Sequence, residues 1–245
     1  MRTRSRHMAA VLLTTAATLA GTATGAGATA EIGGGHLIAR YDMNEGPAAR
    51  TMVDGSGHGL NGTIGSEVVT GVSGGGATGY RFTRLDPDTP PTHPRHLATV
   101  PSASDLNPGG RDYAVTIRLR TQYHFGNIVQ KGQATVDGGN FKLQIPNGIV
   151  QCLFRGDRGS IIVSSRTRLN DGAWHTVRCE RVESGGSPGV VLTVDGTTEA
   201  RRAGRTGYIA NSWPLSIGGK TACDQVRVGC DYYAGDLDYV ELSAR

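Results

Sequence analysis

The chain has 245 residues, of which 37 are glycine and 10 proline; aromatic residues make up 6% and charged residues 19%. This balance argues against a helical bundle, a coiled coil and a charged disordered chain. Three of the 25 basic residues lie in the first thirty positions, whereas all 21 acidic residues follow them. The remainder is therefore nearly neutral, which excludes the basic footprint of a nucleic-acid-binding protein.

The first thirty residues have the features of a secretory signal peptide. Three arginines precede the apolar stretch Met8 to Ala20, which only threonines interrupt, and Ala28-Thr29-Ala30 offers small residues at a cleavage site. We expect residues 1–30 to be removed on export and residues 31–245 to form one domain; cleavage after Ala28 is the alternative. No segment is long and apolar enough to span a bilayer, so the sequence predicts a secreted protein without membrane insertion.

Four cysteines would enter the oxidising compartment that export implies. Their even number favours two disulfides over a zinc site, although the count alone leaves three pairings open. Cys152 and Cys179 lie in strand-like runs, and each shares a face with a valine two residues earlier, which favours a bond between them. Cys223 and Cys230 would then close a short loop.

Short β-branched or alternating runs recur along the chain, with turn dipeptides such as Asn61-Gly62 and Asn147-Gly148 between them. No stretch shows a sustained helical period. This pattern is typical of a β-sandwich or barrel. The expected strands are Leu37–Met43, Gly79–Thr83, His96–Val100, Ala114–Arg120, Asn127–Gln130, Phe141–Ile145, Ile149–Phe154, Ile161–Ser165, Trp174–Glu180, Val190–Val194, Leu215–Ile217 and Asp236–Leu242.

Three stretches, in this order, carry a family resemblance. They are Tyr41–Gly46 with the loop from Asp54 to Thr63, then Asn140–Ile145 with Leu169–Val177 and Leu192–Gly196, and finally Pro214–Gly219 with Tyr233–Val240. Together they resemble the laminin G-like domains of the concanavalin A-like lectin and glucanase superfamily. The resemblance implies an all-β fold, a two-sheet antiparallel jelly-roll β-sandwich, over nearly the whole chain after residue 30.

Trp174 and His175 belong to this resemblance and are interpreted as structural. Trp174 begins a strand directly after an Asp-Gly turn, so we expect its ring to fill the core between the two sheets. We expect His175 to be a hydrogen-bonded strand residue and not a general base, because the sequence places no serine, cysteine or carboxylate partner beside it.

The last expected strand contains candidate catalytic carboxylates. Asp236 and Asp238 are two positions apart and therefore point to the same side of the strand, as a paired-carboxylate glycosidase needs. With Glu241 they resemble the E-x-D-x-x-E strand of jelly-roll glucanases. The first position is Asp instead of Glu, and only four residues follow Glu241. Catalysis by these residues is therefore the alternative to a non-catalytic function.

Calcium is the cofactor to consider, because oxygen-rich loops with glycines suit this cation. The resemblance implies a rim site at Asn140, the carbonyls near Gly156-Asp157 and Ile209, and Asn211. Asn140 stands where the family usually has Asp, which lowers the expected affinity. A second candidate site joins Asp54 to Asp238 and would tie the chain ends together. The alternative for Asp54 is a turn closed by its own side chain.

Aromatic side chains in loops can stack on sugar rings. Trp213, Tyr232 and Tyr233 lie in loop-like stretches and are the expected ligand contacts, and Tyr123 and His124 are secondary candidates. The alternative is that half of these residues cap the core. Phosphate-loop, dinucleotide, G-x-S-x-G and H-E-x-x-H motifs are absent from the sequence.

We therefore expect a secreted binding module that recognises a glycan or an extracellular protein surface, with calcium assisting. The alternatives are a polysaccharide-active hydrolase or lyase on the same fold, and a purely structural extracellular component.

Overall fold

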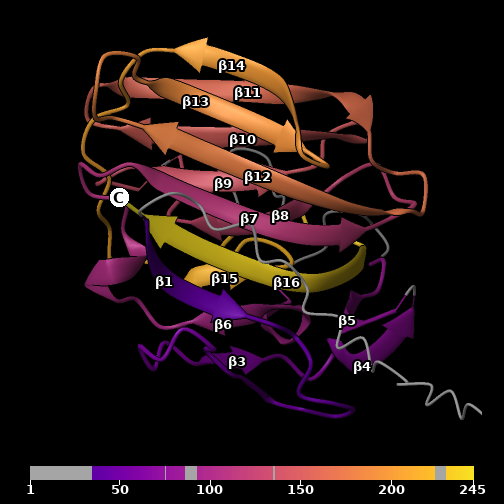
Figure 1. Ribbon diagram of the computed structural model, residues 1–245. Coiled ribbons are helices and arrows are strands. Elements are labelled where there is room, and N and C mark those ends of the chain that lie inside the picture. The colour runs from indigo at the N-terminus through magenta and orange to yellow at the C-terminus, as the bar shows by residue number, and fades with distance from the viewer. Residues whose placement is uncertain (1–34, 75, 86–92, 135, 224–229) are drawn as a thin grey trace, which may run out of the picture. The chain divides into compact units, whose positions relative to one another are not determined.

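The computed structural model describes residues 35–74, 76–85, 93–134, 136–223 and 230–245, and the description below concerns the unit Gly34–Arg245. Its strands form two antiparallel sheets, A in front of B in Figure 1. The predicted jelly-roll β-sandwich is confirmed. The expected signal peptide lies outside the described residues.

Sheet A has the order β14-β13-β12-β7-β16-β5-β4. Strand β5 pairs with the first residues of β16, and β1 pairs with Val240–Ala244 further along the same edge. Its strands are β1 (His36–Tyr41), β4 (Val69–Gly74), β5 (Ala77–Phe82), β7 (Tyr113–Arg120), β12 (Trp174–Val182), β13 (Gly189–Val194), β14 (Thr197–Ala203) and β16 (Gly235–Ala244).

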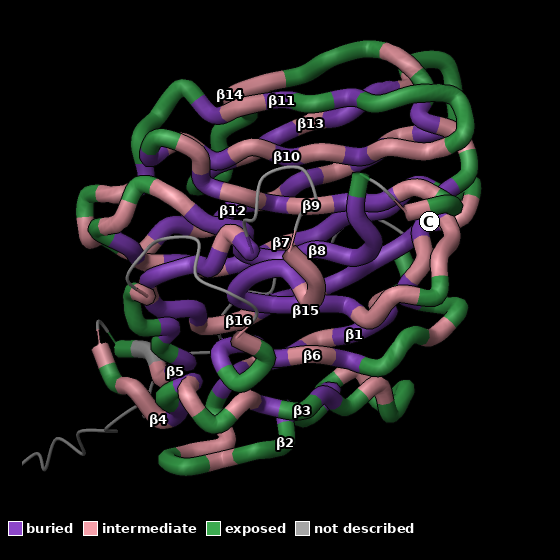
Figure 2. The backbone as a smooth tube through the Cα atoms, turned by 180° about the vertical axis from the view of Figure 1, so that it is seen from behind, coloured by how far each residue is buried: buried purple, intermediate pink, exposed green. Residues whose placement is uncertain are grey.

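Sheet B has the order β11-β10-β9-β8-β15-β6-β3-β2 and faces the viewer in Figure 2. Its strands are β2 (Thr51–Met52), β3 (Gly62–Ile64), β6 (Ala98–Val100), β8 (Asn127–Lys131), β9 (Asn140–Gln144), β10 (Ile149–Gly156), β11 (Gly159–Arg168) and β15 (Leu215–Ile217). Two short 3-10 turns, η1 (Pro94–His96) and η2 (Ser104–Leu106), flank β6.

The core lies between the inner faces of the two sheets. Ile117 and Leu119 of β7 and Phe141 of β9 are fully buried. Because side chains alternate along a strand, the residue that follows each of them points outward. All twelve expected strands are present, although their ends shift by a few residues. No helix among the described residues is long and apolar enough to cross a lipid bilayer.

Two disulfides stabilise this arrangement, with the pairing that the sequence favoured. Cys152 of β10 bonds to Cys179 of β12, so this bond joins sheet B to sheet A through the core. Cys223 bonds to Cys230, across a separation of seven positions.

Candidate functional site

Charged side chains gather on the outer face of sheet A, where β7 and β16 are neighbours. Leu119 points into the core, so Arg118 and Arg120 point outward. Arg120 lies directly opposite Asp236 of β16. The Asp236 carboxylate accepts a hydrogen bond from Nη2 of Arg120 at 2.5 Å and one from Nε of Arg81 at 2.7 Å. Two guanidinium groups therefore fix the position of this carboxylate.

A β-bulge in β16 adds further side chains to the same face. The register with β7 shifts there, so that Asp238 and Tyr239 both lie opposite Arg118. Nη1 of Arg118 donates a hydrogen bond to the Asp238 carboxylate. Further along the strand, Nη1 of Arg40 lies 3.5 Å from the Glu241 carboxylate. The three carboxylates considered for catalysis thus share one face, and each has an arginine beside it.

Trp174 also lies on this outer face, so the prediction that it fills the core is wrong. Strand β12 begins at Trp174, and the alternation turns His175, not Trp174, inward. The indole contacts Arg118 and Arg120, whose guanidinium carbons lie 4.9 and 4.8 Å from its ring centroid. Its Nε1 donates a hydrogen bond to the carbonyl oxygen of Gly74 at 3.1 Å. The ring therefore holds the two arginines and the β4–β5 hairpin together.

A cleft of ≈ 580 Å³, here called the Tyr123 cleft, opens beside Arg120. Its lining includes Tyr123, Arg84, Gln122 and the ion-paired Asp236. The guanidinium carbon of Arg84 lies 4.6 Å from the centroid of the Tyr123 ring. The cleft thus combines an aromatic ring with fixed hydrogen-bond donors and acceptors, which is the composition of a site for a small polar ligand.

The ion pairs set the protonation state of the cleft. Burial alone would raise the pKa of Asp236, but the hydrogen bonds and positive charges of Arg81 and Arg120 outweigh it and hold that pKa below its ordinary value. Asp236 is therefore ionised at neutral pH, and its carboxylate accepts hydrogen bonds without serving as a proton donor.

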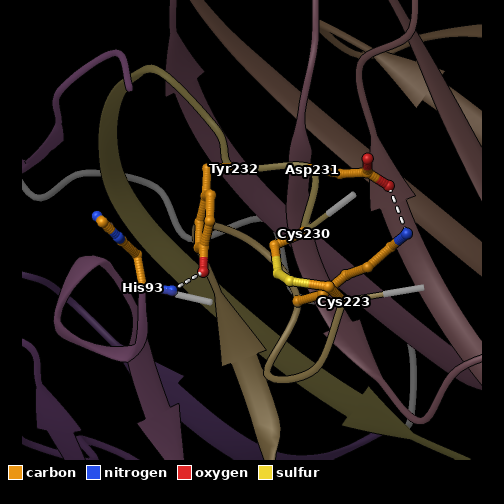
Figure 3. The surroundings of a disulfide bond; sticks show 6 residues. His93, Cys223, Cys230, Asp231 and Tyr232 are labelled. Atoms are coloured by element: carbon orange, nitrogen blue, oxygen red, sulfur yellow. Dashed lines mark hydrogen bonds and ion pairs between the residues drawn. A yellow bond between two sulfur atoms is a disulfide. The ribbon is translucent and has the colours of Figure 1, made fainter. Parts of the chain in front are cut away.

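The two tyrosines expected to contact ligand are buried, which corrects that prediction. Tyr232 packs against Leu97 and the Cys223–Cys230 disulfide, and its hydroxyl accepts a hydrogen bond from the backbone nitrogen of His93 (Figure 3). Tyr233 is fully buried, and its hydroxyl donates to the carbonyl oxygen of Arg120 at 3.2 Å. These rings anchor the chain that leads into β16 and present no face to a ligand.

The residues expected at the calcium rim lie close together, but protein groups already hold their oxygen atoms. The Arg155 guanidinium donates to Oδ1 of Asn140 at 2.8 Å and to the carbonyl oxygen of Gln133 at 2.7 Å. The carbonyl oxygen of Ile209 accepts a hydrogen bond from the backbone nitrogen of Gly109 at 2.8 Å. A cation here would have to displace the Arg155 guanidinium.

Lys131 holds the neighbouring part of this rim. Its side chain is fully buried, and Nζ lies 2.5 Å from the carbonyl oxygen of Trp213 and 3.2 Å from that of Asn211. Half-buried Trp213, the third expected ligand contact, thus supports the rim through its backbone. With an amide at Asn140 and a buried ammonium close by, these residues do not fit a calcium ion, which needs several anionic or carbonyl oxygens of its own.

Asp54 and Asp238 have separate partners. The Asp54 carboxylate accepts hydrogen bonds from the backbone nitrogens of Arg40 and Leu60, both at 3.0 Å, and closes its own turn as the alternative interpretation held. Asp238 is paired with Arg118. The described residues contain no group of three or more His, Cys, Asp and Glu side chains that could hold a metal ion.

Solved structures with the same architecture define the class of the fold. The binding domain of Paraclostridial Mosquitocidal Protein 1 matches with a TM-score of 0.58 and 12% identity, over 85% of this chain and 48% of that chain. Domain 4 of AbnA, a GH43 extracellular arabinanase from Geobacillus stearothermophilus, matches with a TM-score of 0.55 and 14% identity, over 86% and 93%. Domains LG4-5 of the mouse laminin alpha1 chain match with a TM-score of 0.51 and 18% identity, over 74% and 46%.

The chain spans about half the length of the mosquitocidal and laminin structures, and at these identities the likeness shows the fold alone. The amino-acid sequence identifies the family within this fold class, because residues 111–242 match the profile of the laminin G domain family. This match covers more than half of the chain, which therefore belongs to the laminin G domain family. No curated protein matches the chain in a sequence search.

Proposed function

We propose that the chain is a secreted, non-catalytic module that binds a glycan in the Tyr123 cleft. The observation that carries this proposal is the fixed Arg120–Asp236–Arg81 group beside the Tyr123 ring. Sugar hydroxyls can donate to the carboxylate and accept from the guanidinium groups, while the Tyr123 ring adds apolar surface to the lining of the cleft. Because these charged groups hold one another in place before a ligand arrives, little conformational entropy is lost on binding.

Two further observations support the proposal. The arabinanase domain with this fold is in complex with arabinotriose, and the present chain covers 93% of that domain. The two disulfides suit an oxidising compartment, which agrees with the signal-peptide features of residues 1–30. We take secretion from these two observations together.

Glycoside hydrolysis has less support from the same face. A glycosidase needs one carboxyl group that is protonated near neutral pH, which requires a raised pKa. The pKa of Asp236 is lowered instead, and Asp238 and Glu241 each lie beside an arginine. An ionised Asp236 accepts hydrogen bonds and does not supply the acid that hydrolysis needs.

Affinity electrophoresis in gels that contain arabinan, xylan or pectin tests the proposal. We expect at least one polysaccharide to retard the wild-type protein, and Tyr123→Ala to weaken that binding about fivefold to tenfold, as loss of a central contact does. Tyr208→Ala is the matched control, because Tyr208 is 59% exposed and does not line the cleft.

Two results would contradict the proposal. One is a wild-type protein that no polysaccharide retards, and the other is a Tyr123→Ala variant that is retarded as strongly as wild type. New reducing ends in the same samples, lost on Asp238→Asn, would establish the enzyme instead.

A further inference from the structure

A second cleft on the outer face of sheet A has chemistry like that of the Tyr123 cleft. This Tyr239 cleft has a volume of ≈ 350 Å³. Its lining includes Arg40, Asp42, Asn44, Arg118, Asp238 and Tyr239. Of these residues, the sequence pattern singled out Asp238 as a candidate site residue, and Tyr239 reaches this face through the β-bulge.

The two clefts contain the same kinds of groups. In the Tyr239 cleft the guanidinium carbon of Arg40 lies 5.8 Å from the centroid of the Tyr239 ring, as Arg84 lies over Tyr123 in the first cleft. The Arg118–Asp238 pair corresponds to the Arg120–Asp236 pair. Arg40 has a further carboxylate partner in Asp42, with Nε and Oδ1 2.7 Å apart. Each cleft thus offers a tyrosine ring, an arginine guanidinium over it and an Arg–Asp ion pair, and in the Tyr123 cleft Asp236 pairs with Arg81 as well.

The spacing of the two Arg–Asp pairs follows from strand geometry. Arg118 and Arg120 are two positions apart on β7, which separates them by roughly 7 Å along the strand. The Trp174 ring contacts both of them and fixes this distance. Gly74, whose carbonyl oxygen accepts a hydrogen bond from Trp174 and whose backbone lies against the Arg120 guanidinium, and Gly76, which lines the Tyr239 cleft, both belong to the β4–β5 hairpin.

We propose that the two clefts are successive subsites for one extended glycan chain that runs along β7 and β16. This inference rests on the proposed function and deepens it, because it assigns the ligand as a polymer that occupies both clefts and not as a single terminal sugar. Linking two weak sites at a fixed distance raises the affinity for a chain that reaches both of them.

Isothermal titration calorimetry with size-fractionated oligosaccharides tests this inference. The oligosaccharides are prepared from whichever of arabinan, xylan and pectin retards the protein most. We expect affinity to rise tenfold or more with chain length until both clefts are occupied. Tyr239→Ala should remove most of this gain and leave the affinity for the shortest bound oligosaccharide unchanged, whereas Tyr123→Ala should weaken binding at every length.

Asn44→Ala is a second variant for the Tyr239 cleft, because Asn44 is exposed and its loss does not disturb the core. Tyr208→Ala remains the control. The second subsite is refuted if affinity does not rise with length, or if both Tyr239→Ala and Asn44→Ala bind the longest oligosaccharide as tightly as wild type. In either case Tyr123→Ala still reports on the first cleft, so failure of the second subsite is distinguishable from failure of the proposed function.

Discussion

His175 has a carboxylate at each ring nitrogen. Nδ1 lies 2.7 Å from Oδ2 of Asp195, and Nε2 lies 3.1 Å from Oδ1 of Asp171. Only the doubly protonated ring donates to both carboxylates. Burial alone would lower the pKa of His175, but the hydrogen bonds to Asp195 and Asp171 outweigh it and raise that pKa above its ordinary value. The imidazolium ring ties the turn before β12 to the β13–β14 turn.

The stability of the fold should therefore depend on pH through His175. Because its folded-state pKa exceeds the unfolded value of about 6.5, the contribution is fully present below that pH and is lost as pH rises through the folded-state pKa. We expect His175→Gln to lower Tm more at about pH 6 than at about pH 9. Thermal unfolding of both proteins measures this, with exposed His36→Gln as the control. Equal losses at both pH values would disprove the linkage.

Lys131 is a second residue whose removal has a definite cost. Lys131→Met leaves the carbonyl oxygens of Trp213 and Asn211 without their buried donor. We expect the free energy of unfolding to fall by roughly 1–3 kcal/mol, the usual cost of an unsatisfied buried acceptor. Urea unfolding measures the loss. Lys142→Met, on the outward side of β9, is the control and should change stability much less.

The internal positive charges at the rim also give an expectation for calcium. Because Lys131 and Arg155 already bind the oxygen atoms there, we expect neither calcium chloride nor a chelator to shift the Tm of the wild-type protein. A rise in Tm with calcium that the chelator reverses would show that the cation has a site after all.

At the scale of elements, the Cys152–Cys179 disulfide joins the two sheets through the core. Its half-cystines are fully buried and 27 positions apart, whereas Cys223 and Cys230 are seven positions apart. A longer closed loop restricts the unfolded chain more strongly. We expect the Cys152→Ala/Cys179→Ala variant to lose about 2–4 kcal/mol of unfolding free energy. The Cys223→Ala/Cys230→Ala variant should lose less, and denaturant unfolding of both decides the order. A larger loss in the second variant would contradict this account.

Most strands were predictable because they contribute a buried face. Strands such as β7 and β12 alternate between buried and outward positions, and that period is visible in the sequence. The four strands that the sequence did not reveal are β2, β3, β4 and β14, and each of them is very short or lies at a sheet edge. Strand β14, for example, has no fully buried residue, so its sequence carries no such period.

The candidate site was less predictable than the fold. Side chains alternate between the two faces of a strand, and this alternation correctly placed Asp236 and Asp238 on one face. The β-bulge that brings Tyr239 to the same face breaks the alternation and could not be predicted from it. Tyr123 was considered only as a secondary contact, because its position beside Asp236 depends on the pairing of β7 with β16. The burial of Tyr232 results from tertiary contacts with Leu97 and a disulfide, which local sequence does not encode.

At the scale of the whole molecule, charge is balanced both in number and in place. The formal charge of +4 includes the three arginines of the first thirty residues, so the chain without them is nearly neutral. On the outer face of sheet A, Arg118 pairs with Asp238, Arg40 with Asp42 and Glu241, and both Arg81 and Arg120 with Asp236. The proposed ligand surface therefore has donors and acceptors but little net field.

This balance predicts that glycan binding depends weakly on salt. Raising sodium chloride from about 0.05 to about 0.5 M shortens the Debye length from roughly 14 to 4 Å and screens exposed charges, but it leaves hydrogen bonds to hydroxyl groups nearly unchanged. We therefore expect the affinity of the wild-type protein for its retained polysaccharide to change less than about twofold over this range, since paired guanidinium groups contribute little long-range attraction. Calorimetry at both salt concentrations measures the effect. A fall of tenfold or more would mean that a polyanionic glycan binds to exposed arginines such as Arg201 and Arg202 of β14, and replacing those two by glutamine would then abolish the salt dependence.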